Sequence, residues 1–506
     1  MHLRRRLAAA FLAATTLVAP ASATWTVVLV NSETREVIIC SATCLADFDL
    51  QVGLPVVRVG EGAAAAQSFV DQTGQNRLLI WNEFIADTPP KQMIQKLAAS
   101  DGQHQTRQYV IADWDHSPAG FTGQAAGPAK KLELGVDGPW RYSIAGNVLT
   151  AQSVIFEAEA ALLATEGDGM QKVLAAMEAA RALGGDGRCS CALFNPTSCG
   201  APPAGGFTKT AHTGFLIVSR LGDVDGTCNA SVGCANGDYF LDINVIGSIP
   251  DVDPILQIQS QYDQWRAGQA GVVDHYQSSV QPSADDLVAD GVSRSEVTVR
   301  LADIEGAPLT TGGAQLTVHR VDADGAQTTL GPVTDLGDGS YRFDLVAGTT
   351  AGSDTYEITV DDGANTVLLW PPLEIDVDPL TDFHVGRDAV SVLDGATVPV
   401  TLNVGAPSQP YFVLASLSGT VPGLPVASDV LPLNYDAMFE LSALAANTPL
   451  FSGTVGLLDP SGRATASVTL PAGLLDGAAG GRVDLAALLG GTVFGATSGD
   501  GFDLVQ

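Results

Sequence analysis

The stretch ASATWTVVLV at residues 21–30 decides how the first half of this chain is organised. Its opening Ala21-Ser22-Ala23 has the small-x-small form that signal peptidases cleave, and a cut after Ala23 makes Thr24 the first residue of the mature chain. The residues from Trp25 to Val30 are mostly β-branched or apolar and follow a strand-like pattern. The sequence therefore predicts a sheet strand that begins with an N-terminal threonine.

The segment in front of this strand has the other parts of a signal peptide. Arg4-Arg5-Arg6 is a positive region, and residues 7–18 form an apolar run that is too short to span a membrane. No later stretch reaches the ~20 uninterrupted apolar residues of a transmembrane helix. We therefore expect residues 1–23 to be removed and the mature protein to be secreted, periplasmic or at a bacterial cell surface. Cleavage before Ser22 is the alternative, and it would leave Thr24 without a free amine.

An N-terminal threonine carries both halves of a catalytic device. Its hydroxyl can attack a carbonyl carbon, while its α-amine, with an ordinary pKa of about 7.7–8.0, accepts the proton. The bland alternative is that Thr24 has no role, since some residue must follow the cut. Under the chemical interpretation, signal cleavage is itself the activating step.

Length and charge limit the possible architectures and partners. At 506 residues the chain is too long for one core and suggests three domains, at about 100–200 residues each. Lysine is absent after Lys209, and the later part of the chain is rich in Asp, Gly, Thr and Val. The net charge of -31 repels nucleic acids and anionic lipids, so we expect neither as the main partner.

All seven cysteines lie in the first half of the chain, and outside the cytoplasm they are expected to form disulfides. A local pair such as Cys228 with Cys234 is plausible, and the odd count leaves one cysteine over. Cys189, Cys191 and Cys199 could instead be metal ligands, but no repeated Cys-x-x-Cys spacing supports a zinc site. We expect no metal here.

Patterning divides the chain into segments of different class. Residues 24–268 mix strands and helices, which suggests a layered α+β domain. Residues 269–286 read as a linker, and residues 287–377 and 378–506 as two β-sandwich modules. In the first domain we expect strands at 36–41, 55–60, 107–113, 141–145, 213–219 and 239–245, and helices at 62–70 continuing into 76–85, 91–99, 154–164, 170–183 and from Asp253.

Several separated motifs make residues 24–268 resemble the bacterial DUF1028 family. They are TWTVV at 24–28, PVVRVGEGAAAAQ at 55–67, RQYVIAD at 107–113, FTG at 121–123, AGN at 145–147 and GGDGR at 184–188. The resemblance implies a four-layer αββα sandwich similar to the N-terminal nucleophile (Ntn) hydrolases. Family members typically begin Met-Thr, and here the signal cut replaces methionine removal. The resemblance implies no substrate, and the cysteine-rich segment 189–234 departs from the family pattern.

Amide hydrolysis needs an oxyanion donor and groups that orient the nucleophile. Asn147, after Gly146 at a strand end, is the candidate oxyanion donor, and Ser41 is the candidate partner of the amine. Asp186 and Arg188 could form an ion pair that fixes the site. The alternatives are a plain turn asparagine, an ordinary polar strand end and a common helix-ending loop.

Two further residues are candidates for substrate binding. Arg58 could hold a substrate carboxylate, or it could be paired with a carboxylate of its own. Gln67 is expected at a helix start, where a capping or packing role competes with substrate binding. The mechanism does not need His104 or His212. The acidic loop 222–226 with Asp238 is a poor match to a calcium loop, because the later acidic ligands of that motif are missing.

The second half resembles known secreted modules. SEVTVRLADIEGAPL at 295–309 makes residues 287–377 resemble the immunoglobulin-like modules of bacterial adhesins, while 417–420 and 432–436 resemble a β-rich tail of secreted bacterial proteins. Sandwich modules host many functions, so spacing, surface display and sorting are the default roles.

The sequence thus favours a secreted Ntn-type amidohydrolase in which Thr24 attacks a small amide or peptide-like substrate without a cofactor. The alternative is a noncatalytic protein that binds cell-wall or cell-surface material through its adhesin-like modules.

Overall fold

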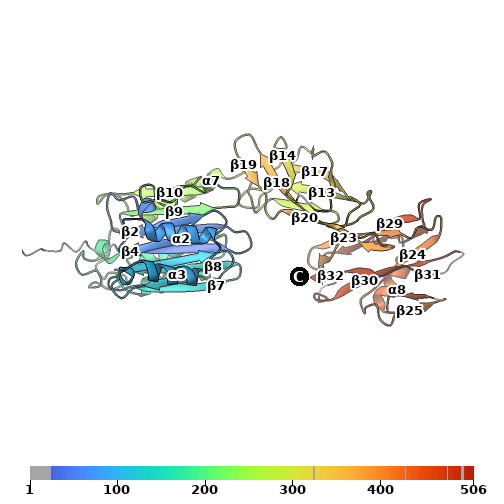
Figure 1. Cartoon of the computed structure of the whole chain (residues 1–506), viewed down its shortest axis with the longest axis horizontal. Helices are drawn as coiled ribbons and strands as arrows, with labels where there is room; N and C mark the ends of the chain where they lie inside the picture. Colours follow the sequence, from blue (N-terminus) through green and yellow to red (C-terminus); the bar gives the residue numbers. More distant parts are fainter. Residues whose placement is uncertain (1–23, 323–324, 428, 476, 492–494) are drawn as a thin grey trace, which may run out of the picture. The chain divides into compact units, whose positions relative to one another are not determined.

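The computed structural model describes residues 24–322, 325–427, 429–475, 477–491 and 495–506. The signal peptide expected at residues 1–23 lies outside these ranges. The chain divides into two compact units that meet between Gly268 and Gln269, coloured blue to green and yellow to red in Figure 1. Among the described helices, none has the length and apolar character needed to cross a membrane.

The first unit contains two antiparallel sheets. The six-stranded sheet has the order β10-β9-β2-β1-β8-β7, and the four-stranded sheet has the order β3-β4-β5-β6. The strands of the larger sheet are β1 (Thr24–Asn31), β2 (Val37–Thr43), β7 (Lys131–Asp137), β8 (Trp140–Asn147), β9 (Thr213–Ser219) and β10 (Leu241–Ile246). Those of the smaller are β3 (Pro55–Arg58), β4 (Gly62–Ser68), β5 (Arg107–Asp113) and β6 (Ala119–Thr122).

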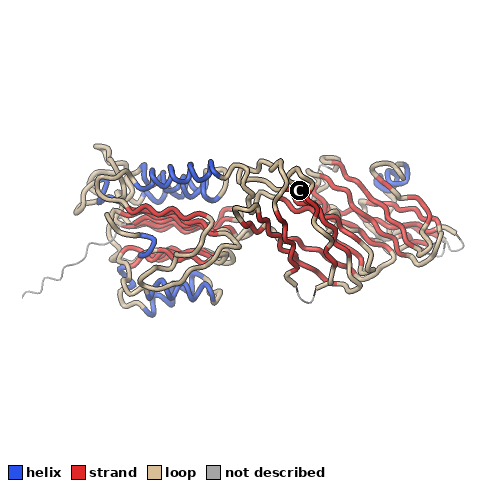
Figure 2. The backbone as a smooth tube through the Cα atoms, turned by 90° about the horizontal axis from the view of Figure 1, so that it is seen from above, coloured by secondary structure: helices blue, strands red, loops and turns tan. Residues whose placement is uncertain are grey.

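Helices cover the outer face of each sheet, so the layers run helix, sheet, sheet, helix, as Figure 2 shows. The helices α4 (Ser153–Ala164), α5 (Gly169–Ala182) and α7 (Pro254–Gly268) pack on the six-stranded sheet, and α2 (Gln75–Ile85) and α3 (Pro90–Ser100) pack on the four-stranded one. The short elements are α1 (Leu50–Gly53), η1 (His104–Thr106) and α6 (Gly187–Ser190). Covered on both sides, β1 is buried along its whole length. The predicted mixed α+β class is confirmed.

The helix expected at 62–70 is wrong, because this segment is strand β4. Its alanines pack in alternation: Ala63 and Ala65 face the core between the sheets, while Ala64 and Ala66 face the core beneath α2 and α3. Packing on two faces therefore outweighs the helix propensity of alanine. At the head of the strand, a Cβ on Gly62 would lie 2.5 Å from the Ala112 carbonyl oxygen.

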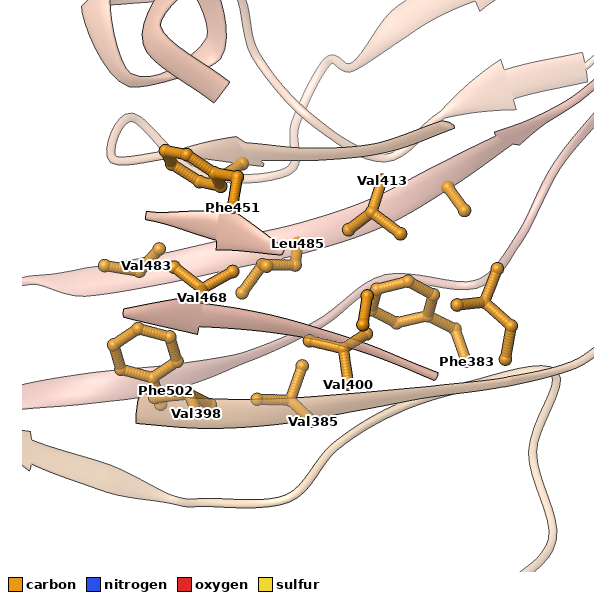
Figure 3. Close-up of a cluster of buried hydrophobic side chains, with 14 of the residues drawn as sticks. Phe383, Val385, Val398, Val400, Val413, Phe451, Val468, Val483, Leu485 and Phe502 are labelled. Carbon is orange, nitrogen blue, oxygen red and sulfur yellow. The ribbon is translucent and has the colours of Figure 1, made fainter. Parts of the chain in front are cut away.

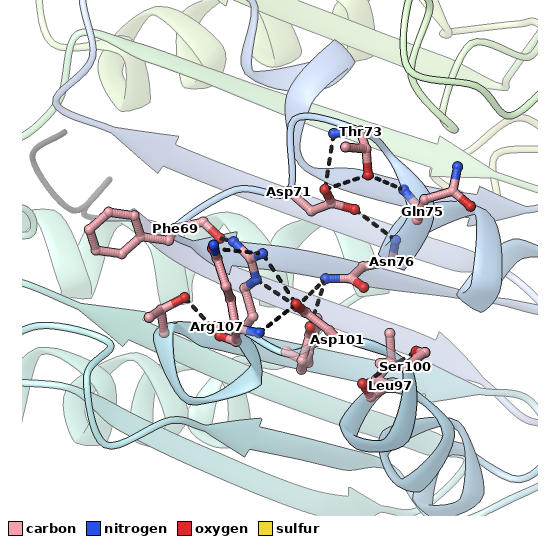
Figure 4. Close-up of polar contacts among 12 residues, drawn as sticks. Phe69, Asp71, Thr73, Gln75, Asn76, Leu97, Ser100, Asp101 and Arg107 are labelled. Carbon is pink, nitrogen blue, oxygen red and sulfur yellow. Dashed lines mark hydrogen bonds and ion pairs between the residues drawn. The ribbon is translucent and has the colours of Figure 1, made fainter. Parts of the chain in front are cut away.

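A polar cluster ties the helices of the outer layer to strand β5 (Figure 4). Arg107 Nε donates to Asp101 Oδ2 at 2.8 Å, and Asn76 Nδ2 donates to the same oxygen at 2.8 Å. Burial raises the pKa of Asp101, but the hydrogen bonds from Arg107 and Asn76 outweigh it and lower the pKa to about 2. Asp101 is therefore ionised at neutral pH and holds α2, α3 and β5 together.

The second unit contains two β-sandwiches. The first joins sheet β11-β13-β17-β15, with β16, to sheet β12-β20-β18-β14, with β19; the second joins β21-β23-β29-β27 to β22-β32-β30-β24-β28, with β31. The first sandwich has β11 (Ser279–Pro282), β12 (Asp286–Val288), β13 (Arg294–Arg300), β14 (Gln315–Arg320), β15 (Thr329–Leu330), β16 (Thr334–Asp335), β17 (Ser340–Val346), β18 (Gly352–Asp361), β19 (Thr366–Leu368) and β20 (Leu373–Asp378).

The second sandwich surrounds a core of valine, leucine and phenylalanine that Figure 3 shows in part. Its strands are β21 (Phe383–Val385), β22 (Ala389–Ser391), β23 (Gly395–Asn403), β24 (Pro410–Ser416), β27 (Phe451–Ser452), β28 (Val455–Leu457), β29 (Arg463–Pro471), β30 (Arg482–Leu489), β31 (Gly495–Ala496) and β32 (Asp500–Val505). The hairpin β25 (Leu424–Val426) and β26 (Asp429–Leu431) and the helix α8 (Ala437–Leu444) complete it.

The segment expected to be a linker, residues 269–286, belongs to the first sandwich. It supplies strand β11 and the first residue of β12, and Val273 is buried in the core. Strand β11 pairs on one side only and ends in Pro282, as an edge strand allows. The proline and the polar residues around it hide this strand from pattern analysis.

Candidate functional site

Thr24 begins the central strand of the six-stranded sheet. In the strand register it lies opposite Thr43 on β2 and opposite Asn147 on β8. Alternate residues of a strand face the same side, so Thr24 shares a face with Thr26. Thr26 Oγ1 donates to Gln67 Oε1 of the facing sheet at 2.6 Å, so this face looks into the space between the sheets. Thr24 thus stands at the end of the inter-sheet layer.

A network of buried hydroxyl and amide groups lies next to Thr24. Gln67 Nε2 donates to Gln108 Oε1 at 2.7 Å, and Asn147 Nδ2 donates to the same oxygen at 3.1 Å. Gln67 Nε2 also donates to the Thr24 carbonyl oxygen at 3.5 Å. All three amide side chains are fully buried, where an unpaired polar group would be costly. The network therefore holds the side chains next to Thr24, and the Thr24 carbonyl oxygen, in fixed positions.

Ser41 lies in this network rather than directly beside Thr24. Its Cα is opposite Thr26, and its hydroxyl contacts Thr26 Oγ1 at 2.8 Å and donates to the Trp25 carbonyl oxygen at 3.0 Å. The residue across from Thr24 is Thr43, which sequence analysis missed. Counting two residues along the strand from Ser41 to the same-face position would have found it.

Asn147 is the amide nearest to Thr24 in the register. It is fully buried, and its Oδ1 has no hydrogen-bond partner in the part of the chain that the structure describes. Its amide group carries two N–H donors, of which one is directed to Gln108. Buried side-chain oxygens without a partner are uncommon, so Asn147 has donor and acceptor capacity to offer a ligand at this point.

Asp186 and Arg188 form the predicted ion pair at the same corner. Arg188 Nη2 lies 2.8 Å from Asp186 Oδ2, and Arg188 Nε lies 3.1 Å from Asp186 Oδ1, which is a bidentate arrangement. Arg188 Nη2 also reaches Thr43 Oγ1 at 3.5 Å. Asp186 Oδ2 accepts from the Cys44 amide at 2.8 Å, so the pair is held to the end of β2.

The turn before this pair requires glycine. Gly184 and Gly185 have φ angles of 101° and 49°, in the left-handed region. A Cβ on Gly185 would lie 2.8 Å from the Trp25 ring. The close approach places the loop against β1.

Arg58 is placed away from Thr24. Its Nη1 lies 2.7 Å from Asp225 Oδ2, and its guanidinium stacks over the Trp81 ring at 4.8 Å. It is opposite Gly62 in the register, at the far end of β4 from Gln67. Arg58 is therefore paired with a carboxylate of the protein itself, which is the alternative to substrate binding. That carboxylate is Asp225 of the acidic loop.

Gln67 lies on strand β4, not at a helix start as the sequence suggested. Its side chain faces the inter-sheet layer and bonds to Thr26 and Gln108. The structure thus brings Thr24, Ser41, Gln67, Asn147, Asp186 and Arg188 into one region and leaves Arg58 outside it.

His212 is a second residue near the site that sequence analysis set aside. Its backbone N–H donates to the Thr43 carbonyl oxygen at 2.9 Å, and its Nδ1 lies 3.1 Å from Lys209 Nζ. Burial and the positive charge of Lys209 lower the pKa of His212, so its imidazole is neutral at pH 7. Its position just before β9, which pairs with β2, is the signal that could have found it.

Disulfides link six of the seven cysteines. The pairs are Cys44–Cys189, Cys191–Cys199 and Cys228–Cys234. The predicted local pair is confirmed, and the pairing engages the three cysteines considered as metal ligands. Cys40 is the free cysteine, and burial raises the pKa of its thiol, so it is unreactive.

Comparison with protein families matches two parts of the chain. Residues 24–195 match DUF1028, described as a family of unknown function. Residues 274–368 match domain 3 of invasin. A comparison with curated proteins gave no match. The chain therefore carries a DUF1028 region at 24–195 followed by an immunoglobulin-like invasin domain at 274–368, which confirms the resemblances to DUF1028 and to adhesin modules. The resemblance of the C-terminal segment to β-rich tails stays a prediction.

Solved structures similar to this chain include a DUF1028 protein and bacterial adhesins. The crystal structure of protein SPO2555 from Silicibacter pomeroyi, of the DUF1028 family, is 16% identical, with 48% of this chain and 89% of that chain covered and a TM-score of 0.34. The Yersinia pseudotuberculosis adhesin InvE is 23% identical, with coverage of 45% and 58% and a TM-score of 0.17. Invasin, a bacterial integrin-binding protein, is 14% identical, with coverage of 58% and 46% and a TM-score of 0.17.

Proposed function

We propose that the first unit is an Ntn-type amidohydrolase whose nucleophile is Thr24, exposed by removal of residues 1–23. The observation that carries this proposal is the position of Thr24 as the first residue of the central strand, at the end of the inter-sheet layer and opposite Asn147. The order of layers, helix, sheet, sheet, helix, supports it, since this is the arrangement expected of Ntn hydrolases.

The reaction follows from the groups at this corner. The Thr24 hydroxyl attacks the amide carbonyl carbon while the α-amine takes the hydroxyl proton. The tetrahedral oxyanion accepts a hydrogen bond from the second N–H of Asn147. The C–N bond breaks, the ammonium returns its proton to the leaving amine, and an ester remains on Thr24. Water, deprotonated by the same amine, then releases the acid and restores the threonine.

The surrounding residues position these groups. Gln67 holds the Thr24 carbonyl oxygen, and the Asp186–Arg188 pair holds Thr43 and the end of β2. Arg188 is paired bidentately with Asp186, so its proposed role is to position Thr43 rather than to bind a substrate anion. The substrate class is a small amide or peptide-like compound.

The test uses the exported protein and an electrophilic amide-hydrolase probe, read by intact mass and N-terminal analysis. We expect a chain that starts at Thr24 and gains one probe mass on that residue. Thr24→Ala should lose the labelling and Thr24→Ser should keep it. A protein with one extra alanine before Thr24 keeps the hydroxyl but loses the amine at the nucleophile, so it should label far more slowly. Equal labelling of all these proteins would contradict the mechanism.

A second function is supported by the match of residues 274–368 to invasin domain 3. We propose that the second unit attaches the protein to cell-surface or cell-wall material. It has hydrophobic cores of its own, so residues 269–506 should fold and bind without the first unit. A pull-down on cells and purified wall material compares this part with the full chain. If the full chain attaches but residues 269–506 do not, the first unit is needed for binding and the proposal for the second unit is contradicted.

A further inference from the structure

The second unit carries a cluster of carboxylates around one histidine where its two sandwiches adjoin. Asp286 begins β12 and Asp378 ends β20, both in the first sandwich. His384 lies on β21 and Asp500 begins β32, both in the second. The four side chains therefore come from both sandwiches, on either side of the short connection 379–382.

The distances within the cluster are too long for direct hydrogen bonds. His384 Nδ1 is 3.7 Å from Asp378 Oδ2 and 3.9 Å from Asp500 Oδ2, and His384 Nε2 is 3.8 Å from Asp286 Oδ1. One ligand atom from each of Asp286, Asp378 and His384 lies within 4.8 Å of the other two. An ion that contacts its ligands at about 2.0–2.2 Å fits between atoms at this spacing after a small closure.

Asp286 points to a missing partner. Its side chain is 9% exposed, and its Oδ1 accepts no hydrogen bond in the described parts of the chain. Arg387 faces Asp285, and Arg482 is shared among Asp484, Asp503 and the Oδ1 of Asp500, which lies 3.9 Å from Arg482 Nη2. In the described parts of the chain, neither Asp286 nor Asp378 has an arginine or lysine partner.

The histidine is oriented to coordinate. Its Nε2 lies 3.2 Å from the Asp286 carbonyl oxygen, to which an N–H at this position donates. In this tautomer Nδ1 carries a lone pair directed at the Asp378 and Asp500 carboxylates, and two sets of lone pairs repel each other unless a cation lies between them. An imidazolium without a metal is the rival arrangement, in which His384 forms ion pairs of 3.7–3.9 Å with Asp378, Asp286 and Asp500, and the metal titration distinguishes the two.

We propose that His384, Asp286 and Asp378, with Asp500 beside them, bind one divalent transition-metal ion of the Zn²⁺ class. A mixed set of imidazole nitrogen and carboxylate oxygen suits Zn²⁺, whereas Ca²⁺ prefers oxygen ligands alone. A cavity of about 680 Å³, lined by Asp286, His384 and Arg463, adjoins the cluster and gives an ion access. The bound ion would tie the two sandwiches together across the connection 379–382.

The experiment uses the full mature chain, stripped with a chelator and titrated with Zn²⁺, with Ca²⁺ in parallel. Calorimetry and metal analysis after desalting give affinity and stoichiometry, and thermal unfolding of the second unit gives the coupling to stability. The variants are His384→Ala and Asp378→Asn; the latter side chain is 52% exposed, so its replacement leaves the core intact. The matched controls are His319→Ala and Asp394→Asn, both at exposed positions.

We expect one Zn²⁺ per chain, a raised unfolding temperature, and affinity reduced about tenfold or more in both site variants but not in the controls. Absence of Zn²⁺ from the wild-type chain would overturn the proposal. So would equal Zn²⁺ affinity in Asp378→Asn, His384→Ala and wild type, or a preference for Ca²⁺ that His384→Ala leaves unchanged.

Discussion

The strands of the two units bury their side chains differently. Strand β1 of the first unit is buried at every position, whereas β13 of the second alternates between buried and exposed residues. The first unit covers both faces of each sheet, while most sandwich strands leave one face to solvent. In the second sandwich, α8 and the hairpin β25–β26 cover part of one outer face, over β24 and β30. Polar residues of the second unit can therefore point outward. Those of the first unit must pair with one another inside, and the layer from Thr24 to Asn147 is the result.

The largest expected effect is the loss of stability when an apolar core residue of the second unit is truncated, and it tests whether the two units have independent cores. Phe343 lies in the core of the first sandwich and is 2% exposed. Phe343→Ala should lower the free energy of unfolding of the second unit by about 3–5 kcal/mol through lost burial and the cavity left behind. Hydrogen exchange with peptide resolution separates the two units. Leu336→Ala, at an exposed position, is the control, and an equal loss of protection in the first unit would contradict the independence of the cores.

A smaller loss of stability is expected when a residue of the buried polar layer in the first unit is replaced. Gln67→Leu keeps the volume but leaves the Thr26 hydroxyl without its acceptor and Gln108 Oε1 without one of its two donors. We expect a loss of about 1–3 kcal/mol in the first unit, because buried polar groups lose their partners. Denaturant unfolding measures it, with the exposed Gln92→Leu as control. A Gln67→Leu protein as stable as wild type would show that the polar layer is not needed for the fold.

The smallest effect concerns how the stability of the first unit depends on pH, and it sharpens the comparison. The pKa of Asp101 is lowered from 3.8 to about 2 in the folded state. Its contribution to stability is therefore full above pH ~4 and is lost as the pH falls towards 2, amounting to about 2 kcal/mol. Asp101→Asn should destabilise the first unit at pH 6 and remove this part of the acid dependence. Thermal unfolding from pH 6 to 2 measures it. The exposed Asp263→Asn should follow the wild-type curve.

The two units differ in what their sequences reveal. The β-rich class of the second unit could be predicted, because strands such as β13 alternate between buried and exposed residues. In the first unit, the sequence predicts a helix where β4 lies, because a run of alanines has the same pattern whether it packs on one face or on two. Strand β11 was missed because Pro282 at an edge looks like a linker.

Several residues of the candidate site could be predicted from the sequence, but the strand pairing that places them opposite one another could not. Thr24, Asn147 and the Asp186–Arg188 pair are predicted from the expected signal cut and the family motifs. Thr43 is not, because pairing between strands is a long-range property that fixes which residue faces Thr24. Arg58 and Asp225 are far apart in sequence, so their mutual pairing could be seen only in three dimensions.

The four alanines of β4 constrain how this protein can change over time. Ala63 and Ala65 touch one core while Ala64 and Ala66 touch another, so a larger residue at any of them overpacks a layer that has no solvent side. Substitutions here must be compensated in the neighbouring layer at once, whereas an outward position of a sandwich strand can vary alone. Random mutagenesis with selection for folding should therefore leave β4 almost untouched while the outer faces of the second unit diverge freely.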